Sequence, residues 1–146
     1  MVVDFGAVSS GYHSDETCTF VVGRAGERQR RLYALVKEAH DRALEAVRPG
    51  VLCRDVDAAA RAVIEKAGYG ALFSHGTGHG LGLDIHEAPR LSALSDAVLE
   101  EGMVVTVEPG IYLPGFGGIR IEVTVLVEKA GGRVLTEFSK ELLVIE

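Results

Sequence analysis

The sequence predicts an α+β fold, with strands toward both ends of the chain and two helices between them. Three observations indicate it: a Val- and Phe-rich start that reaches a Ser-Ser-Gly turn, two segments with helical periodicity, and a second half of short β-type segments separated by Gly and Pro. At 146 residues the chain suits one domain with a sizeable core. We therefore expect a single domain over residues 1–146.

The first expected elements are a hairpin and a long helix. Residues 1–8 and about 12–22 flank the turn at Ser9-Ser10-Gly11, which predicts two paired strands. From Glu27 to Val47, apolar residues recur at spacings of three and four with charges between them. That spacing is typical of an amphipathic helix, and Pro49-Gly50 should end it.

A second helix is predicted to begin with Asp55 as its N-cap and to stop at Gly68. The stretch 74–87 that follows is too rich in glycine for a helix, so we expect loop and strand there. Three further strands are predicted between turns that contain Pro and Gly. They are Met103–Glu108, Ile119–Glu128 and Arg133–Glu137.

Charge and cysteine usage narrow the classes of function. The net charge is −6 and the Lys and Arg residues are scattered, so nucleic acid is not an expected partner. No secretory leader pattern or membrane-length apolar run is present, and we expect a cytoplasmic protein with no membrane partner. Cys18 and Cys53 lie far apart without metal-type spacing, which predicts free buried thiols.

Four acidic residues and one histidine sit in or beside predicted strands, where an ionised side chain is costly unless it is paired. They are Asp4, Asp15, His79, Glu108 and Glu122. Several carboxylates brought together repel one another and lose hydration, and a divalent cation compensates for both effects. Four carboxylates and one imidazole are too many for one tetrahedral zinc, but they suit two ions that share bridging carboxylates.

Each of these residues, taken alone, has a plain structural interpretation. Asp4 near Gly6 could belong to an Asx-type turn, and Asp15 could be a charge on an edge strand. His79 could be a loop histidine between glycines, Glu108 could cap a turn, and Glu122 could lie on the polar face of a strand. Together these interpretations are weak, because the surrounding residues repeat a known pattern.

Five blocks of sequence carry that pattern. They are Asp4-Phe-Gly-Ala, Gly11-Tyr-His-Ser-Asp15-Glu-Thr, His75-Gly-Thr-Gly-His79 through His86-Glu, Val107-Glu108-Pro-Gly-Ile-Tyr, and Gly118-Ile-Arg120-Ile-Glu122. In order and spacing they closely resemble the pita-bread metallopeptidases of the aminopeptidase P and prolidase branch. The resemblance implies the pita-bread fold and a metal-dependent exopeptidase that cleaves between an N-terminal residue and proline.

The resemblance also implies a role for each residue. Asp4 would chelate one metal ion, Asp15 and Glu122 would bridge both ions, and His79 and Glu108 would complete the other. A hydroxide that bridges the metals would attack the scissile carbonyl, with Glu108 as proton shuttle. The remaining catalytic residues implied are His75 and His86, which would position the substrate, and Arg120, which would orient ligands and substrate.

Several alternatives stay open at this point. Manganese is our first choice for the two divalent ions, with cobalt, zinc and iron as alternatives, because all suit carboxylate and imidazole ligands. The substrate could be a Xaa-Pro dipeptide or a longer peptide. A methionine aminopeptidase, another pita-bread hydrolase such as a creatine amidinohydrolase, or a non-catalytic fragment are the competing functional interpretations.

The chain departs from the family pattern in two places. Cys18 stands where these enzymes usually have arginine, and the chain begins three residues before Asp4, without the segment that normally precedes it. We therefore expect the C-terminal part of a catalytic domain, a pita-bread fold that is N-terminally incomplete, and impaired activity of this chain alone. The mean hydropathy of +0.20 and the strand edge beside Asp4 predict a homo-oligomer.

Overall fold

The computed structural model describes residues 1–146, in two helices, a short 3-10 turn and twelve strands. The helices are α1 (Glu27–Ala46) and α2 (Cys53–Lys66), and the turn is η1 (Gly70–Leu72). The strands are β1 (Val2–Phe5), β2 (Val8–Ser9), β3 (Tyr12–His13), β4 (Glu16–Val22), β5 (Gly78–Gly80), β6 (Glu87–Leu91), β7 (Val104–Val107), β8 (Gly110–Leu113), β9 (Gly117–Arg120), β10 (Val123–Glu128), β11 (Gly131–Val134) and β12 (Leu143–Ile145).

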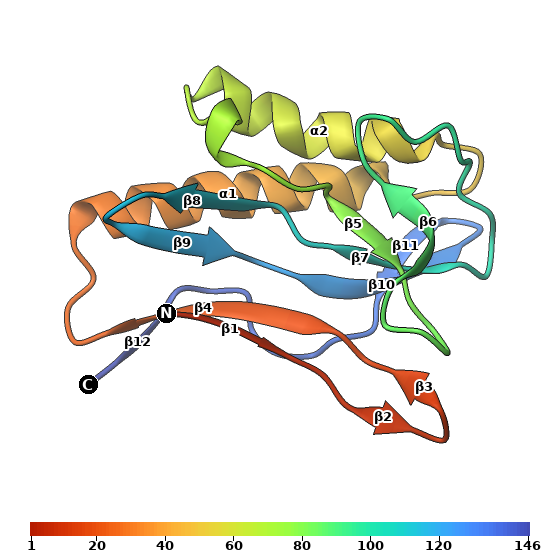
Figure 1. The fold of residues 1–146 in the computed structure, drawn as a ribbon, viewed down its shortest axis with the longest axis horizontal. Helices are drawn as coiled ribbons and strands as arrows, with labels where there is room; N and C mark the ends of the chain where they lie inside the picture. Colours follow the sequence, from red (N-terminus) through yellow and green to blue (C-terminus); the bar gives the residue numbers. More distant parts are fainter.

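The elements lie in layers. The two helices run side by side above the strands, and β1, β4 and β12 lie on the opposite side of the molecule (Figure 1). A five-stranded sheet has the order β11-β10-β7-β5-β6, with antiparallel neighbours throughout. A three-stranded sheet has the order β1-β4-β12, and β2–β3 and β8–β9 form separate hairpins. Strands from both ends of the chain therefore pair around β4.

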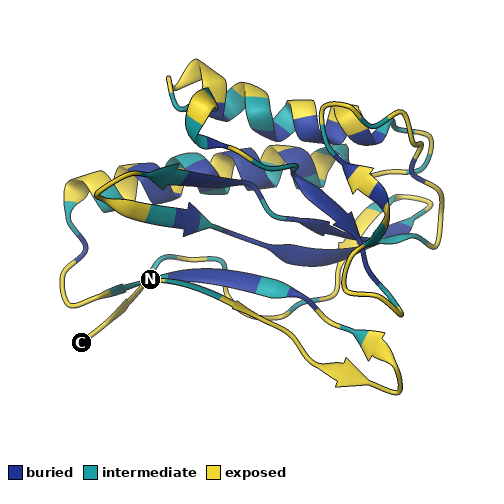
Figure 2. Ribbon diagram, viewed as in Figure 1, coloured by how far each residue is buried: buried dark blue, intermediate teal, exposed yellow.

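The core lies between the helices and the five-stranded sheet. Most residues of β7 and β10 are buried, and α1 and α2 turn one apolar stripe toward them (Figure 2). The helices contribute residues such as Val36, Ala39, Val56 and Ile64, and the sheet contributes Val105, Val107 and Val125, all fully buried. Burial of a large apolar side chain contributes roughly 1.5–3 kcal/mol. Packing against the helices thus holds in place the sheet that carries several of the predicted site residues.

Most of the predicted elements are present. The amphipathic segment is a helix from Glu27 to Ala46, and Gly68 follows α2 with φ of 84°, a left-handed conformation that favours glycine. The glycine-rich stretch is loop and strand, as expected. Cys18 and Cys53 are both buried and free. No helix combines the length and apolar character needed to cross a bilayer.

The predicted N-cap at Asp55 is wrong, because α2 begins at Cys53 with Leu52 as the capping residue. The Cys53 amide donates to the carbonyl oxygen of Ala97 at 2.8 Å. Since a distant backbone group satisfies this helix end, no side-chain cap is needed there. Asp55 lies in the first turn, where the helix dipole still favours a negative charge.

The predicted continuous strand Ile119–Glu128 is interrupted. β9 ends at Arg120 and β10 begins at Val123, and the two strands belong to different sheets. The amide of Glu122 donates to the carbonyl oxygen of Thr17 on β4 at 3.1 Å. Glu122 therefore lies at the junction between the sheets rather than on a polar strand face.

Candidate metal centre

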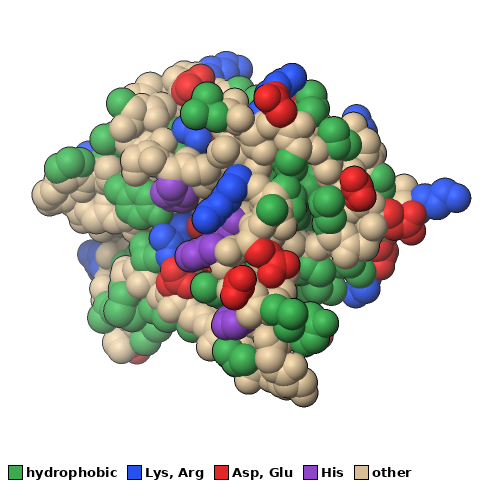
Figure 3. All heavy atoms as spheres, turned by 45° about the vertical axis from the view of Figure 1, so that its right-hand side comes forward, with side chains coloured by type: hydrophobic (Ala, Val, Ile, Leu, Met, Phe, Trp, Pro, Cys, Tyr) green, Lys and Arg blue, Asp and Glu red, His purple; other side chains and the backbone are tan.

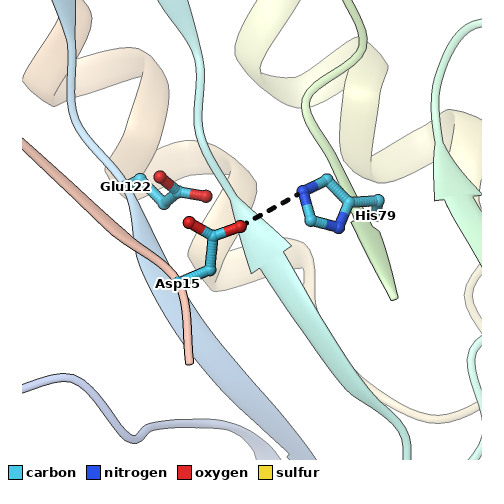
Figure 4. Close-up of side chains that lie close together, drawn as sticks. All are labelled: Asp15, His79 and Glu122. Atoms are coloured by element: carbon cyan, nitrogen blue, oxygen red, sulfur yellow. Dashed lines mark ion pairs between the residues drawn. The ribbon is translucent and has the colours of Figure 1, made fainter. Parts of the chain in front are cut away.

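Three buried side chains from distant parts of the sequence converge between the two sheets. Asp15 precedes β4, His79 lies on β5, and Glu122 lies between β9 and β10 (Figure 4). Each offers one metal-ligating atom, and these atoms lie within 4.8 Å of one another. The residues are only 7%, 4% and 2% exposed, in that order. This is the arrangement expected of ligands around a bound cation.

Glu108 adjoins this cluster. Its Oε1 lies 3.2 Å from His79 Nε2, and Asp15 Oδ2 lies 3.6 Å from the same nitrogen. Thr106 connects the strands, because its hydroxyl donates to Glu108 Oε1 at 3.1 Å and accepts the His79 amide at 3.0 Å. The relative position of Glu108 and His79 is thus set by a side chain on β7.

The glycines on either side of His79 permit the close approach of neighbouring strands. A Cβ at Gly78 would lie 1.9 Å from the carbonyl oxygen of Thr106, and one at Gly80 would lie 2.3 Å from that of Ala88. Both distances are far below contact, so a side chain at either position would force the strands apart. The spacing of glycines around His79 therefore has a packing origin.

The protonation behaviour of the cluster reflects burial and crowding. Burial raises the pKa of Asp15, and the nearby Asp4 carboxylate adds to that rise. Burial, and then the charge of Glu108, raise the pKa of Glu122 to about 8. Burial also opposes ionisation of Glu108, but the hydrogen bond and charge of His79, the charge of His75 and the hydrogen bond from Thr106 together outweigh it and lower the pKa of Glu108. Burial lowers the pKa of His79, but its hydrogen bonds to Glu108 and to the Gly80 carbonyl and the charges of Glu108 and Asp15 together raise it.

The donor set fits divalent cations. Asp15 and Glu122 are carboxylates removed from water, and burial, followed by the charges of neighbouring carboxylates, raises the pKa of both. A divalent cation between them would favour ionisation of both. Carboxylate oxygen with one imidazole nitrogen suits Mn²⁺, Co²⁺, Fe²⁺ and Zn²⁺ alike. The residues that are present therefore match the group that the sequence led us to expect.

Asp4 is placed differently from the other predicted ligands. It lies on the edge strand β1, its side chain is 56% exposed, and its carboxylate forms an ion pair with Arg120. It does not belong to the group of atoms within 4.8 Å. Arg120 also donates to Tyr112 at 3.1 Å and to the hydroxyl of Thr17 at 3.1 Å. Thr17 in turn donates to Glu122, so a polar chain joins Asp4 to the cluster.

A cavity of about 280 Å³ opens beside the cluster and has no hydrophobic residue in its lining. The predicted catalytic residues His75, His86, Glu108 and Arg120 all line it, together with His79. The rings of His79 and His86 lie 4.3 Å apart in an edge-on arrangement. In space-filling view, histidine, basic and acidic side chains gather on this face of the molecule (Figure 3).

Some residues around the cavity were not singled out from the sequence. Tyr112 contacts His75 Nε2 at 2.9 Å as well as Arg120, and Arg90 and Ser92 line the cavity wall. Tyr112 falls inside the motif Val107-Glu108-Pro-Gly-Ile-Tyr, which could have drawn attention to it. Thr17 likewise ends the motif Gly11-Tyr-His-Ser-Asp15-Glu-Thr. Thr106 lies outside the quoted motifs and carries no comparable signal, because a buried threonine on a strand is common without any role in a site.

Comparison with known proteins identifies the family. A family model described as metallopeptidase family M24 matches residues 1–129. The chain belongs to metallopeptidase family M24. The M24 chain is 50% identical over 143 residues to an Xaa-Pro dipeptidase from Pyrococcus furiosus, covering 98% of this chain and 41% of that protein.

Solved structures give the same result. The M24 chain matches an Xaa-Pro dipeptidase from Bacillus anthracis with a TM-score of 0.96, 48% identity, and coverage of 99% of this chain and 41% of the other. It matches an X-Pro aminopeptidase from Thermotoga maritima with a TM-score of 0.96, 40% identity and coverage of 99% and 41%. The fold is thus α+β of the pita-bread type, and the chain spans about two fifths of the length of these relatives.

Proposed function

We propose that this M24 chain carries the metal centre of an enzyme that hydrolyses the bond between an N-terminal residue and proline. The observation that supports this most strongly is the buried group of Asp15, His79 and Glu122, with ligand atoms within 4.8 Å, beside a cavity with a polar lining. The names of the relatives, an Xaa-Pro dipeptidase and an X-Pro aminopeptidase, support proline in the second position.

The proposed ligands are the five residues predicted from the sequence. Asp15 and Glu122 would bridge two divalent cations, with Asp4 on one and His79 and Glu108 on the other. Manganese is our first choice, and cobalt, iron or zinc would accept the same ligands. When bound, such cations lower the pKa of a water molecule and polarise a carbonyl group. Asp4 would have to exchange its contact with Arg120 for one with a cation.

The side chains around the cavity would handle the proton and the substrate. Glu108, held by Thr106, would take a proton from the attacking water and pass it to the nitrogen of proline as that nitrogen leaves. Arg120 and His75 share the hydroxyl of Tyr112 at 3.1 and 2.9 Å, which fixes both donors at the cavity. With His86, they would orient the substrate and stabilise negative charge on the carbonyl oxygen.

The competing functions make different predictions for substrate and metal. A methionine aminopeptidase would release methionine from peptides without proline, and a creatine amidinohydrolase would not require a metal. A non-catalytic fragment would fold without turnover. The names of the relatives favour the first proposal but leave the choice between dipeptides and longer peptides open.

The test is hydrolysis of matched peptides with added Mn²⁺. We expect release of the N-terminal residue from Ala-Pro or Ala-Pro-Ala, measured by mass spectrometry, and no release from Ala-Ala-Ala. Glu108→Gln should remove that activity, because the amide cannot accept the proton. Release from Met-Ala-Ala but not from the proline peptides would instead indicate a methionine aminopeptidase. Stoichiometric Mn²⁺ binding without any turnover would support a non-catalytic chain.

Impaired turnover and self-association of the chain alone are further parts of the proposal. β1 is an edge strand with Phe5 45% exposed, and an unpaired edge favours pairing with another chain. Light scattering would test this, with a dimer or larger assembly expected and a monodisperse monomer as the contrary result.

A further inference from the structure

A buried ion pair on α2 is a feature to which the proposed mechanism gives no part. Asp57 is fully buried, and Arg61, one turn later, donates from Nε to Oδ2 at 2.8 Å and from Nη2 to Oδ1 at 2.9 Å. Neither residue lines the cavity. A buried carboxylate loses several kcal/mol of hydration, roughly, so a pair kept at such a place needs its hydrogen bonds. The further partners of this pair are therefore informative.

All of those partners lie on the segment that carries the two histidines. Asp57 Oδ1 accepts the amide of Thr77 at 3.0 Å and its hydroxyl at 2.9 Å. Arg61 donates to the carbonyl oxygen of Phe73 at 3.0 Å and to that of His75 at 2.9 Å. The pair thus contacts the backbone on both sides of His75, and Thr77 is two residues before His79.

Two further contacts carry this restraint to the cavity. The carbonyl oxygen of Thr77 accepts the amide of Glu108 at 2.7 Å, so the position of Thr77 also sets that of Glu108. The guanidinium of Arg61 lies 4.2 Å from the centre of the Phe73 ring. The Phe73 ring in turn packs edge-on against the His75 ring, and the two ring centres are 5.1 Å apart. Movement of the ion pair would therefore move His75, His79 and Glu108 together.

We propose that Asp57 and Arg61 are positioning residues that hold the Phe73–His79 segment and Glu108 in the geometry needed for metal binding. The planar guanidinium is required, because it donates four hydrogen bonds at once, two to the Asp57 carboxylate and one each to the Phe73 and His75 carbonyl oxygens, whereas an ammonium group has only three N–H donors. The inference rests on the proposed metal centre. A merely structural ion pair would affect the stability of the chain without a specific effect on the metal.

The test compares Mn²⁺ affinity, the visible spectrum of the Co²⁺-loaded chain and thermal stability in matched variants of the full 146-residue chain. Asp57→Asn removes the negative charge of the pair. Arg61→Lys keeps the positive charge but replaces the planar guanidinium with an ammonium group. Ile64→Val, on the same helix and fully buried, lowers stability and changes an apolar side chain that forms no hydrogen bond with the segment. Asp41→Asn removes the acid of another i,i+4 pair, with Lys37 on α1.

We expect Asp57→Asn and Arg61→Lys to weaken Mn²⁺ binding by roughly 10–100-fold, as loss of an outer partner of a ligand commonly does. Both should change the Co²⁺ spectrum, whereas Ile64→Val and Asp41→Asn should leave affinity and spectrum as in the unmodified chain. If Asp57→Asn does not fold, Arg61→Lys decides. Unchanged binding in Arg61→Lys, or equal loss in Ile64→Val, would overturn the positioning role. Absence of Mn²⁺ binding in the unmodified chain would overturn the metal centre as well.

Discussion

Asp15 and Asp4 lie on either side of the same β2–β3 hairpin, yet the fold gives them opposite surroundings. Asp15 is 7% exposed, and burial and neighbouring carboxylates raise its pKa. The side chain of Asp4 is 56% exposed and is already paired with Arg120. A buried carboxylate without an arginine or lysine partner needs a bound metal ion to stabilise its negative charge, whereas a carboxylate paired with arginine does not. Asp15 should therefore matter more for metal binding than Asp4.

The largest expected effect distinguishes the two aspartates directly. Asp15→Asn should abolish binding of both Mn²⁺ ions, because it removes a bridging ligand from the buried group. Asp4→Asn should spare the first ion and weaken only the second. Titration calorimetry on the metal-free chain would resolve the two steps. If Asp4→Asn loses both ions and Asp15→Asn keeps one, the comparison is reversed.

A second prediction concerns pH and the metal-free chain in a chelating buffer. The pKa of Glu122 rises from 4.5 to about 8 on folding, so the folded chain keeps a proton that the unfolded chain releases. Glu122 should therefore make the free energy of unfolding fall as pH rises between 4.5 and about 8, and this one group contributes at most about 1.4 kcal/mol per pH unit. Urea unfolding across this range should show the slope, and Glu122→Gln should reduce it. Glu45→Gln, which removes an exposed carboxylate on α1, should leave the slope in place.

The smallest expected effect comes from the polar chain between Asp4 and the cluster. Thr17 donates to Glu122 and accepts from Arg120, whereas Thr19, two residues along β4, contacts only the backbone of Arg120. Thr17→Val keeps the shape but leaves Glu122 without its donor, and Mn²⁺ affinity should fall by roughly tenfold. Thr19→Val is the matched control and should bind Mn²⁺ as the unmodified chain does. Equal affinities in the two variants would argue against a role for Thr17.

The sequence predicted the elements with strong local signals. The helix from Glu27 has a regular apolar spacing over its whole length, and Gly68 ends α2 as its type suggests. The N-cap at Asp55 was wrong, because the Ala97 carbonyl that satisfies this helix end is far away in sequence. The break at Glu122 was missed for a similar reason, since only its bond to Thr17 takes it out of a continuous strand.

The candidate site divides in the same way. His75, His79, His86, Glu108 and Arg120 were named from the motifs, and the structure brings them to one cavity. The exposure of Asp4 and its pairing with Arg120 depend on how β1 lies against β9, which no motif encodes. Asp57 and Arg61 lie one helical turn apart, a spacing that many exposed ion pairs share. Only the burial of Asp57 and its hydrogen bond to Thr77 distinguish this pair from those, and neither can be read from the sequence.

The central claim is that the buried group formed by Asp15, His79 and Glu122 holds divalent cations. The most direct measurement is an anomalous difference map from crystals of the chain grown with Mn²⁺. We predict two peaks, one shared by His79 and Glu108 and the other beside Asp4, with Asp15 and Glu122 in contact with both. Peaks only at surface carboxylates, with none between Asp15 and Glu122, would contradict the account.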